Sequence, residues 1–246
     1  MNIFEHANKK IDLITDGCFQ PNLTTRVILS AAINQLSNYS NNIDNIIEIG
    51  CGCGVISTYL MYHSYIDNIQ YLGLSDLSEK AIEISKLNIG LKGNLKKEID
   101  IHFKIGSGLT LWKDENFDMV INDISALSEA IVPMNNWFDN APNNSGIDGI
   151  ENTKIVLEEF NSIANKGAFM LFPVLSLSNT KLLFSELGKL PLEYERLSSQ
   201  AWPLPAQMVE KYYDELCKLR DLEHINFETK FGQCIAKTEC YKVWKT

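Results

Sequence analysis

Several features that define other protein classes are missing from this sequence. No apolar run among its 246 residues approaches the ~20 residues that a membrane-spanning helix needs. Residues 1–17 contain no basic segment followed by an apolar core, so we expect no secretory signal and a cytoplasmic location. Internal repeats and low-complexity tracts are absent as well. The length fits one ordinary domain with, at most, an embellishment.

An excess of positive charge is also missing. The chain has 22 Lys and Arg residues against 31 Asp and Glu residues, a formal net charge of −9. Broad, sequence-independent binding of nucleic acid requires a positive surface that displaces counterions. We therefore expect no nucleic-acid partner, and the lack of a long apolar run predicts no membrane partner. The three lysines of residues 90–97 indicate a solvated loop.

The cysteines lack the spacing of a metal site. None of the six belongs to a C-x-x-C pair, and none of the four histidines lies near a cysteine at a zinc-like spacing. Cys51 and Cys53 flank one glycine in a tight turn, from which two sulfurs can hardly be aimed at one metal. We expect no metal, and we expect the cysteines to be reduced, small apolar residues.

What the sequence does contain is an alternation of short apolar runs and longer segments of helical periodicity. The runs predict strands at residues 45–50, 69–75, 99–105, 116–123, 167–174, 194–199 and 234–244. The periodic segments predict helices at residues 23–36, 54–63, 77–89, 150–165 and 177–190. Such alternation produces a parallel sheet covered by helices on both faces. Residues 202–224 insert a proline turn and a helical segment before the last strand.

The stretch I-I-E-I-G-C-G-C-G-V-I-S, residues 46–57, places a glycine-rich turn between a strand and a helix. Glycines permit close approach of a ligand to the backbone, and the start of a helix offers unpaired N–H groups. Position 55 is Val, so this is not the G-x-G-x-x-G dinucleotide motif. Glu48 lies inside the preceding strand, and Asp76 ends the next one, where a carboxylate can bind both hydroxyls of a ribose. These features predict a nucleotide-like ligand at the turn.

The pattern E-x-G-x-G-x-G with an acidic residue at the end of the second strand resembles the class I S-adenosylmethionine-dependent methyltransferases. The resemblance implies a doubly wound, Rossmann-like α/β fold, with seven strands and an antiparallel last strand. It implies S-adenosylmethionine as the cofactor, with its amino-acid end at Glu48, Gly50 and Gly52, its ribose at Asp76, and its adenine beside residues 107–109. The full set of cofactor-binding residues expected from it is Phe19, Thr25, Glu48, Gly50, Cys51, Gly52, Gly54, Asp76, Leu77, Ser107, Gly108, Leu109 and Asn122.

Three further segments are similar to the glutamine N-methyltransferases that modify peptide-release factors. G-C-F-Q-P-N-L-T-T (17–25) resembles their F-x-P-x-x-x-T segment. D-L-S-E-K-A (76–81) resembles their D-x-S-x-x-A, and S-G-I-D-G-I (145–150) resembles their G-G-x-D-G-L. The motifs occur in the family's order over residues 17–190.

The resemblance breaks at the fourth predicted strand, where that family carries N-P-P-Y. Here the corresponding residues are Asn122, Asp123, Ile124 and Ser125, so both prolines and the aromatic residue are replaced. The clamp for a planar nitrogen is therefore not assembled, and methylation of glutamine or adenine is not favoured. We expect Asn122, Asp123 and Ser125 to be catalytic, because a carboxylate and a hydroxyl suit a polar or cationic substrate. In the alternative interpretation, Asp123 only caps the turn and Ser125 begins a loop.

Aromatic residues give a second pair of alternatives. Trp137, Phe138 and Trp202 either line a pocket that attracts a sulfonium or ammonium group, or pack beneath a lid.

Together these features predict a methyltransferase acting on a small polar molecule. We expect an N-terminal helical cap over residues 1–40, a methyltransferase-like domain over 41–246, and a lid over the insertion 203–230. Three alternatives stay open. The first is a cyclase that cleaves S-adenosylmethionine to a four-membered-ring amino acid and methylthioadenosine. The others are a glutamine N-methyltransferase of a protein substrate, and a cofactor-binding regulatory subunit. The accepting atom and the oligomeric state are open.

Overall fold

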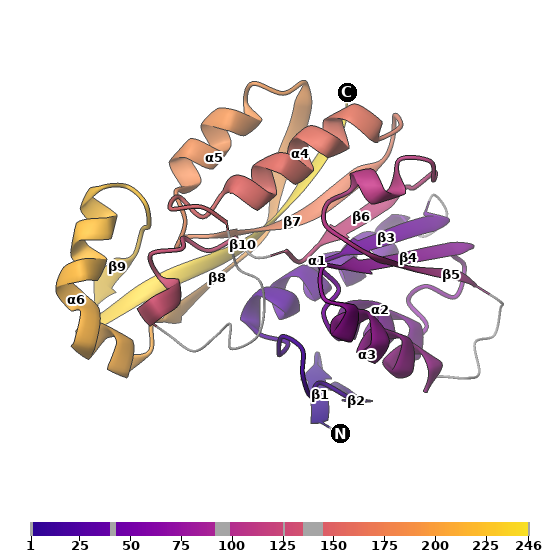
Figure 1. Ribbon diagram of the computed structural model, residues 1–246, viewed down its shortest axis with the longest axis horizontal. Coiled ribbons are helices and arrows are strands. Elements are labelled where there is room, and N and C mark those ends of the chain that lie inside the picture. Colours follow the sequence, from indigo (N-terminus) through magenta and orange to yellow (C-terminus); the bar gives the residue numbers. More distant parts are fainter. Residues whose placement is uncertain (1, 40–42, 92–98, 125, 135–144, 246) are drawn as a thin grey trace.

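The computed structural model describes residues 2–39, 43–91, 99–124, 126–134 and 145–245, and it contains a mixed sheet covered by helices on both faces (Figure 1). The strand order is β5-β4-β3-β6-β7-β10-β8, with β9 paired to β10. β3 to β7 run parallel, and β10 is antiparallel to β7, β8 and β9. The predicted seven-stranded sheet with an antiparallel last strand is confirmed, and the short β9 adds one strand.

The elements lie close to the predicted segments. The strands of the sheet are β3 (Asn45–Ile49), β4 (Tyr71–Asp76), β5 (Asp100–Ile105), β6 (Met119–Asn122), β7 (Phe169–Leu175), β8 (Leu192–Pro203), β9 (Glu228–Lys230) and β10 (Gln233–Lys245). The helices are α1 (Leu23–Tyr39), α2 (Val55–Tyr62), α3 (Glu79–Gly90), α4 (Glu151–Ile163), α5 (Thr180–Leu187) and α6 (Ala206–Asp221). Strands in the middle of the sheet are buried on both faces, which is why β3 and β7 read as continuous apolar runs.

Two hydrophobic clusters fill the two sides of the sheet. α1, α2 and α3 cover one face, and α4 and α5 cover the other (Figure 1). Chain order reverses between β3 and β6: β4 and β5 lie on one side of β3, and β6 lies on the other. Ligands of open α/β sheets bind at the carboxyl ends of the strands beside such a reversal.

The N-terminal segment contains a β-hairpin that the sequence did not predict. β1 (Asn2–His6) pairs antiparallel with β2 (Lys9–Leu13). Phe4, Ile11 and Leu13 are buried and anchor the hairpin to the helices of one face. Residues 1–40 therefore hold a hairpin in front of their helix rather than a purely helical cap.

The insertion 203–230 forms α6 and β9 at one end of the sheet (Figure 1). Its apolar side packs against the segment that follows β6; the buried residues of this cluster are Leu127, Ile131, Leu177, Leu204, Met208, Leu216, Ile225, Phe227, Cys234 and Ala236.

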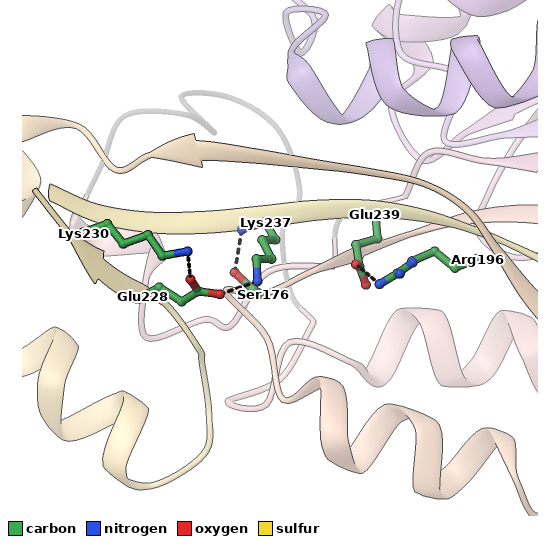
Figure 2. Close-up of polar contacts among 6 residues, drawn as sticks. All are labelled: Ser176, Arg196, Glu228, Lys230, Lys237 and Glu239. Carbon is green, nitrogen blue, oxygen red and sulfur yellow. Dashed lines mark hydrogen bonds and ion pairs between the residues drawn. The ribbon is translucent and has the colours of Figure 1, made fainter.

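Ion pairs fasten β9 and β8 to β10, as Figure 2 shows. Glu228 on β9 pairs with Lys230 of the same strand and with Lys237 of β10. Arg196 on β8 lies 2.9 Å from Glu239 of β10.

Candidate cofactor and acceptor site

A single cavity collects most of the predicted site residues at the carboxyl ends of β3, β4, β5 and β6. The ten that line it are Phe19, Thr25, Gly50, Cys51, Gly52, Asp76, Leu77, Ser107, Gly108 and Asp123. Four do not line it: Glu48, Gly54, Leu109 and Asn122. Ser125, Trp137 and Phe138 lie outside the described residues.

The glycine turn presents bare backbone to this cavity at Gly52. Its φ is +53°, a conformation that L side chains rarely adopt. A Cβ added there would meet nothing closer than the Phe19 carbonyl oxygen, 3.9 Å away. The amides of Gly50 and Cys51 donate to the Ser75 carbonyl at 2.9 and 3.0 Å, which holds the turn against β4. A ligand can thus occupy the space that a side chain would fill.

Asp76 is fixed beside the turn by two backbone amides. One carboxylate oxygen accepts from Gly52 N at 2.9 Å, and the other accepts from Ser78 N at 2.8 Å. Each carboxylate oxygen has a further lone pair, so both can also accept from a pair of ribose hydroxyls. Leu77 is 56% exposed and lines the same cavity, where it offers an apolar surface to a ring.

Glu48 supports the turn from below instead of reaching the cavity. Its side chain is buried, and its carboxylate accepts from the backbone N–H of Ser57, at 3.1 Å, and from the Ser57 hydroxyl. Ser57 lies in the first turn of α2, so Glu48 occupies the electropositive end of that helix. Burial raises the pKa of the Glu48 carboxyl to about 8. In this structure Glu48 holds the start of α2 beside the glycine turn.

Two more predicted cofactor residues have packing roles. A Cβ on Gly54 would lie 2.4 Å from Ser85 Oγ, so the missing side chain lets α2 approach α3. Leu109 is buried in the core, and its amide donates to Glu159 Oε2 at 2.5 Å.

Two roles were open for the segment after β6, capping the turn and contributing a side chain to the site, and Asn122 and Asp123 differ in these roles. The Asn122 side chain is buried, and its Oδ1 accepts from Ile124 N at 3.0 Å, which fixes the turn after β6. Asp123 is half-buried at the cavity wall, where its Oδ2 accepts from the Thr25 hydroxyl at 2.9 Å. Asn122, not Asp123, therefore caps the turn. Within the described residues, no donor reaches Asp123 Oδ1.

The environment of Asp123 favours its protonated form. Burial, the largest cause, raises the pKa of the Asp123 carboxyl to about 7; the Thr25 hydrogen bond opposes this, and the negative charge of Asp76 adds to it. A carboxyl group with such a pKa can gain or lose a proton near neutral pH.

The first turn of α1 positions Thr25, and the sequence carried a recognisable signal for it. Thr25 N donates to Asn22 Oδ1 at 3.2 Å, and Asn22 N donates to Thr25 Oγ1 at 3.5 Å, a reciprocal arrangement similar to a capping box. Asn22 also lines the cavity and was not predicted from the sequence. Asn152, two residues after the motif at 145–150, lines the cavity and was not predicted either.

The described cavity lining has a distinct charge. It contains two carboxylates, those of Asp76 and Asp123, and no Lys, Arg or His side chain. A cavity of this kind repels anions and attracts cations.

Two further expectations can be placed in the structure. Trp202 does not line the cavity; its indole N–H donates to Thr238 Oγ1 at 3.0 Å. No described residue of the insertion 203–230 lines the cavity either. The insertion touches the site indirectly, because it packs against Leu127, which does line the cavity.

Comparison with known proteins agrees with this geometry. The family model of the methyltransferase small domain matches residues 25–123, which is less than half of the chain but includes the glycine turn, Asp76 and Asp123. No curated protein matches the sequence.

Three solved structures share the fold at low sequence identity. The YcgJ protein of Bacillus subtilis is 11% identical, with a TM-score of 0.54 over 89% of this chain and 98% of that one. Precorrin-6y C5,15-methyltransferase of Geobacter metallireducens is 9% identical, with a TM-score of 0.53 over 95% and 93%. The tRNA m1G37 methyltransferase of M. jannaschii is 12% identical, with a TM-score of 0.52 over 99% of this chain and 55% of that one.

Fold and matched domain together define the class. The protein has the class I methyltransferase fold and is an S-adenosylmethionine-dependent transferase. The bare backbone at Gly52 and the fixed carboxylate of Asp76 fit that cofactor. No helix in the described part of the chain is both long and apolar enough to cross a membrane.

Proposed function

We propose that this protein transfers the methyl group of S-adenosylmethionine to a small polar acceptor that binds beside Asp123. The observation that carries the proposal is that one cavity joins the glycine turn and Asp76 to a carboxyl group able to exchange a proton near neutral pH. The two carboxylates and the absence of a basic side chain among the described lining residues favour a neutral or cationic acceptor over a phosphate or carboxylate.

The chain's own residues supply binding and alignment. When bound, the cofactor supplies a methyl group on a positively charged sulfur. A correctly placed nucleophile can attack the methyl carbon and displace the sulfur directly. Gly52 leaves room against the backbone, and Asp76 accepts from two hydroxyls. Holding both reactants in line accounts for much of the rate in such a displacement.

Asp123 handles the proton. Its Oδ1 can take a proton from the acceptor, while Thr25 holds Oδ2 in place. Asn122 keeps this carboxyl group at the cavity wall by fixing the turn on which both residues lie. Asn122 is thus a positioning residue, and Asp123 is the proposed base.

A second candidate is cyclisation of the cofactor itself. The observation that favours it is that Asn122 Oδ1 is engaged by Ile124 N, so no described residue rebuilds the clamp for a planar acceptor nitrogen. In that case Asp123 would take a proton from the cofactor's own amine, and methylthioadenosine would be released. Incubation with S-adenosylmethionine alone separates the two reactions, because methyl transfer gives S-adenosylhomocysteine only when an acceptor is present.

The proposed function is tested with S-adenosylmethionine that carries a labelled methyl group. The protein is incubated with this cofactor and with the low-molecular-weight or the protein fraction of a cell extract. We expect label in small molecules. Label confined to protein would contradict the proposed acceptor class.

Cofactor binding is tested at the glycine turn. Gly52→Val should weaken binding of S-adenosylhomocysteine at least about tenfold, because a branched side chain fills the ligand's space and the φ is unsuitable for it. Gly90→Val is the matched control, since a Cβ at Gly90 meets no atom within 4 Å. Calorimetry on both variants provides the measurement. Equal affinities would place the cofactor elsewhere.

A further inference from the structure

Two cysteines that are far apart in the sequence meet at the wall of the cavity. Cys18, on the segment before α1, and Cys53, in the glycine turn, both line the cavity. The two thiols lie close enough for each to shift the pKa of the other. Cys18 is half-buried, and its Sγ also donates to the Thr15 carbonyl at 3.3 Å; Cys53 is buried. Neither sulfur forms a disulfide in this structure.

The fold holds these two segments together through a single side chain. Asn88 of α3 is fully buried, and its Nδ2 donates to the carbonyls of Ile14, at 2.9 Å, and Cys53, at 2.8 Å. Its Oδ1 accepts from Ile14 N at 2.8 Å. Because one buried side chain is hydrogen-bonded to both backbone segments, the fold keeps the two cysteines close together.

The two thiols differ in reactivity. The hydrogen bond from Cys53 lowers the pKa of the Cys18 thiol, whereas the same bond and burial raise the pKa of Cys53. The thiolate is the nucleophile in oxidation chemistry, so Cys18 reacts first. Cys51 is not an equivalent partner: its buried sulfur lies 3.6 Å from Ser85 Oγ.

We propose that Cys18 and Cys53 are an oxidation site, at which a peroxide forms a reversible disulfide that closes the cofactor cavity. The Cys18 thiolate attacks one peroxide oxygen, the O–O bond breaks, and a sulfenic acid and one water result. The Cys53 sulfur then attacks the sulfenic sulfur, the S–O bond breaks, and a second water leaves with the Cys53 proton. Two thiols are oxidised, and one peroxide is reduced to two waters.

The bond would alter the site because it shortens the contact. An S–S bond of ~2.05 Å is shorter than any hydrogen bond between thiols, so the segment carrying Cys18 and Phe19 must move toward the glycine turn. The Phe19 carbonyl is the nearest atom to the bare face of Gly52, and that space is where the proposed cofactor lies. This closure rests on the proposed cofactor site, and we expect a bound cofactor to protect the thiols.

The experiment treats the full-length reduced protein with hydrogen peroxide and maps its disulfides by mass spectrometry without reduction. Trypsin cleaves after Arg26 and Lys80 and leaves Cys51 and Cys53 in one peptide. Variants are therefore needed to show which of these two cysteines is linked to Cys18. Cys18→Ser and Cys53→Ser should each abolish the link, and Cys51→Ser should retain it. Cys217→Ser is the matched control, because Cys217 is half-buried on α6 outside the cavity.

The second measurement is the affinity for S-adenosylhomocysteine before and after oxidation of each variant. We expect oxidation to lower the affinity of the wild type about tenfold or more, dithiothreitol to restore it, and the ratio to stay near one in Cys18→Ser and Cys53→Ser. Normal binding without a Cys18–Cys53 link overturns the oxidation site alone. A link with unchanged affinity overturns the closure. A link in a protein that never binds the probe overturns the proposed cofactor site.

Discussion

Glu48 is a buried carboxyl group and Asp123 a half-buried one on neighbouring strand ends, and their partners give them different uses. Glu48 accepts from Ser57 at the start of α2 and does not line the cavity. Asp123 accepts from Thr25 and lines the cavity. Burial is the largest cause of the raised pKa in both, so the pKa alone does not distinguish a structural carboxyl from a proposed base. Accessibility from the cavity does.

The role of Asp123 predicts a pH dependence. The base form is needed to accept a proton, so wild-type turnover should rise as pH passes about 7 and level off above it. Asp123→Asn should be slower, on the order of 10- to 100-fold, with a flat profile through this range. Single-turnover rates of methyl transfer over a pH series check this. Thr25→Ser, which keeps a hydroxyl, is the control; an Asp123→Asn profile that matches wild type would contradict the assignment.

Glu48 predicts a pH dependence of stability. Its pKa is raised from 4.5 to about 8 in the folded state, so the stability that its proton provides is fully present below 4.5 and is lost as pH rises through 8. Between these values the wild type should lose stability relative to Glu48→Gln, on the order of a few kcal/mol. Urea unfolding at several pH values measures the difference. Glu79→Gln, at an exposed position on α3, should follow the wild type; parallel curves for Glu48→Gln would be the contrary result.

At the scale of elements, the motif at residues 145–150 connects the insertion to the site. Asp148 Oδ1 lies 2.9 Å from Nδ1 of His224, which follows α6 within the insertion, and it accepts from Asn179 Nδ2 at 2.9 Å. A Cβ on Gly149 would lie 2.3 Å from Ser128 N, so this loop packs directly against the segment that carries Leu127. The insertion is thereby linked to the cavity wall, and its action as a lid stays a prediction.

This link predicts that His224 holds the insertion in place. His224→Ala should remove a partly buried hydrogen bond and lower the free energy of local opening of α6 by about 1–2 kcal/mol. Glu223→Ala is the matched control, because the neighbouring Glu223–Lys181 pair is exposed on both sides and such pairs contribute little. Hydrogen exchange of the α6 amides gives the measurement. Similar exchange in the two variants would mean that Asp148 does not anchor the insertion.

At the scale of the whole molecule, the prediction that no metal is needed concerns charge and ligand groups. The protein carries a formal net charge of −9, yet the described residues include no group of three His, Cys, Asp or Glu side chains arranged to hold a metal ion. Both carboxylates of the described cavity lining already accept hydrogen bonds.

Chelation should therefore leave cofactor binding unchanged. After dialysis against EDTA, affinity for S-adenosylhomocysteine should stay within about twofold of the untreated protein, since neither the glycine turn nor Asp76 needs a metal to form its contacts. Elemental analysis before dialysis is the control. A stoichiometric metal that leaves together with binding would refute this prediction.

The sequence alone determined the architecture and the position of the glycine turn. Alternating apolar runs and helical segments specify a doubly wound sheet. A strand that is buried on both faces gives a continuous apolar run, whereas a helix that is buried on one face gives apolar residues at helical spacing. Gly52 and Asp76, which both line the cavity, were identifiable because the proposed close backbone approach and ribose contact need those residue types at fixed places. The hairpin at Asn2–Leu13 was missed, since its short strands bury few side chains and give little periodicity.

Only the tertiary structure decided which side chains reach the cavity. Glu48, Gly54 and Asn122 belong to the right motifs, yet each is used in packing or capping, and a motif does not say which way its side chain points. The contact of Cys18 with Cys53 was equally hidden, because it depends on a buried Asn88 that joins two segments far apart in the chain. Sequence patterns record local periodicity and residue type, whereas these contacts arise from how separate elements pack in three dimensions.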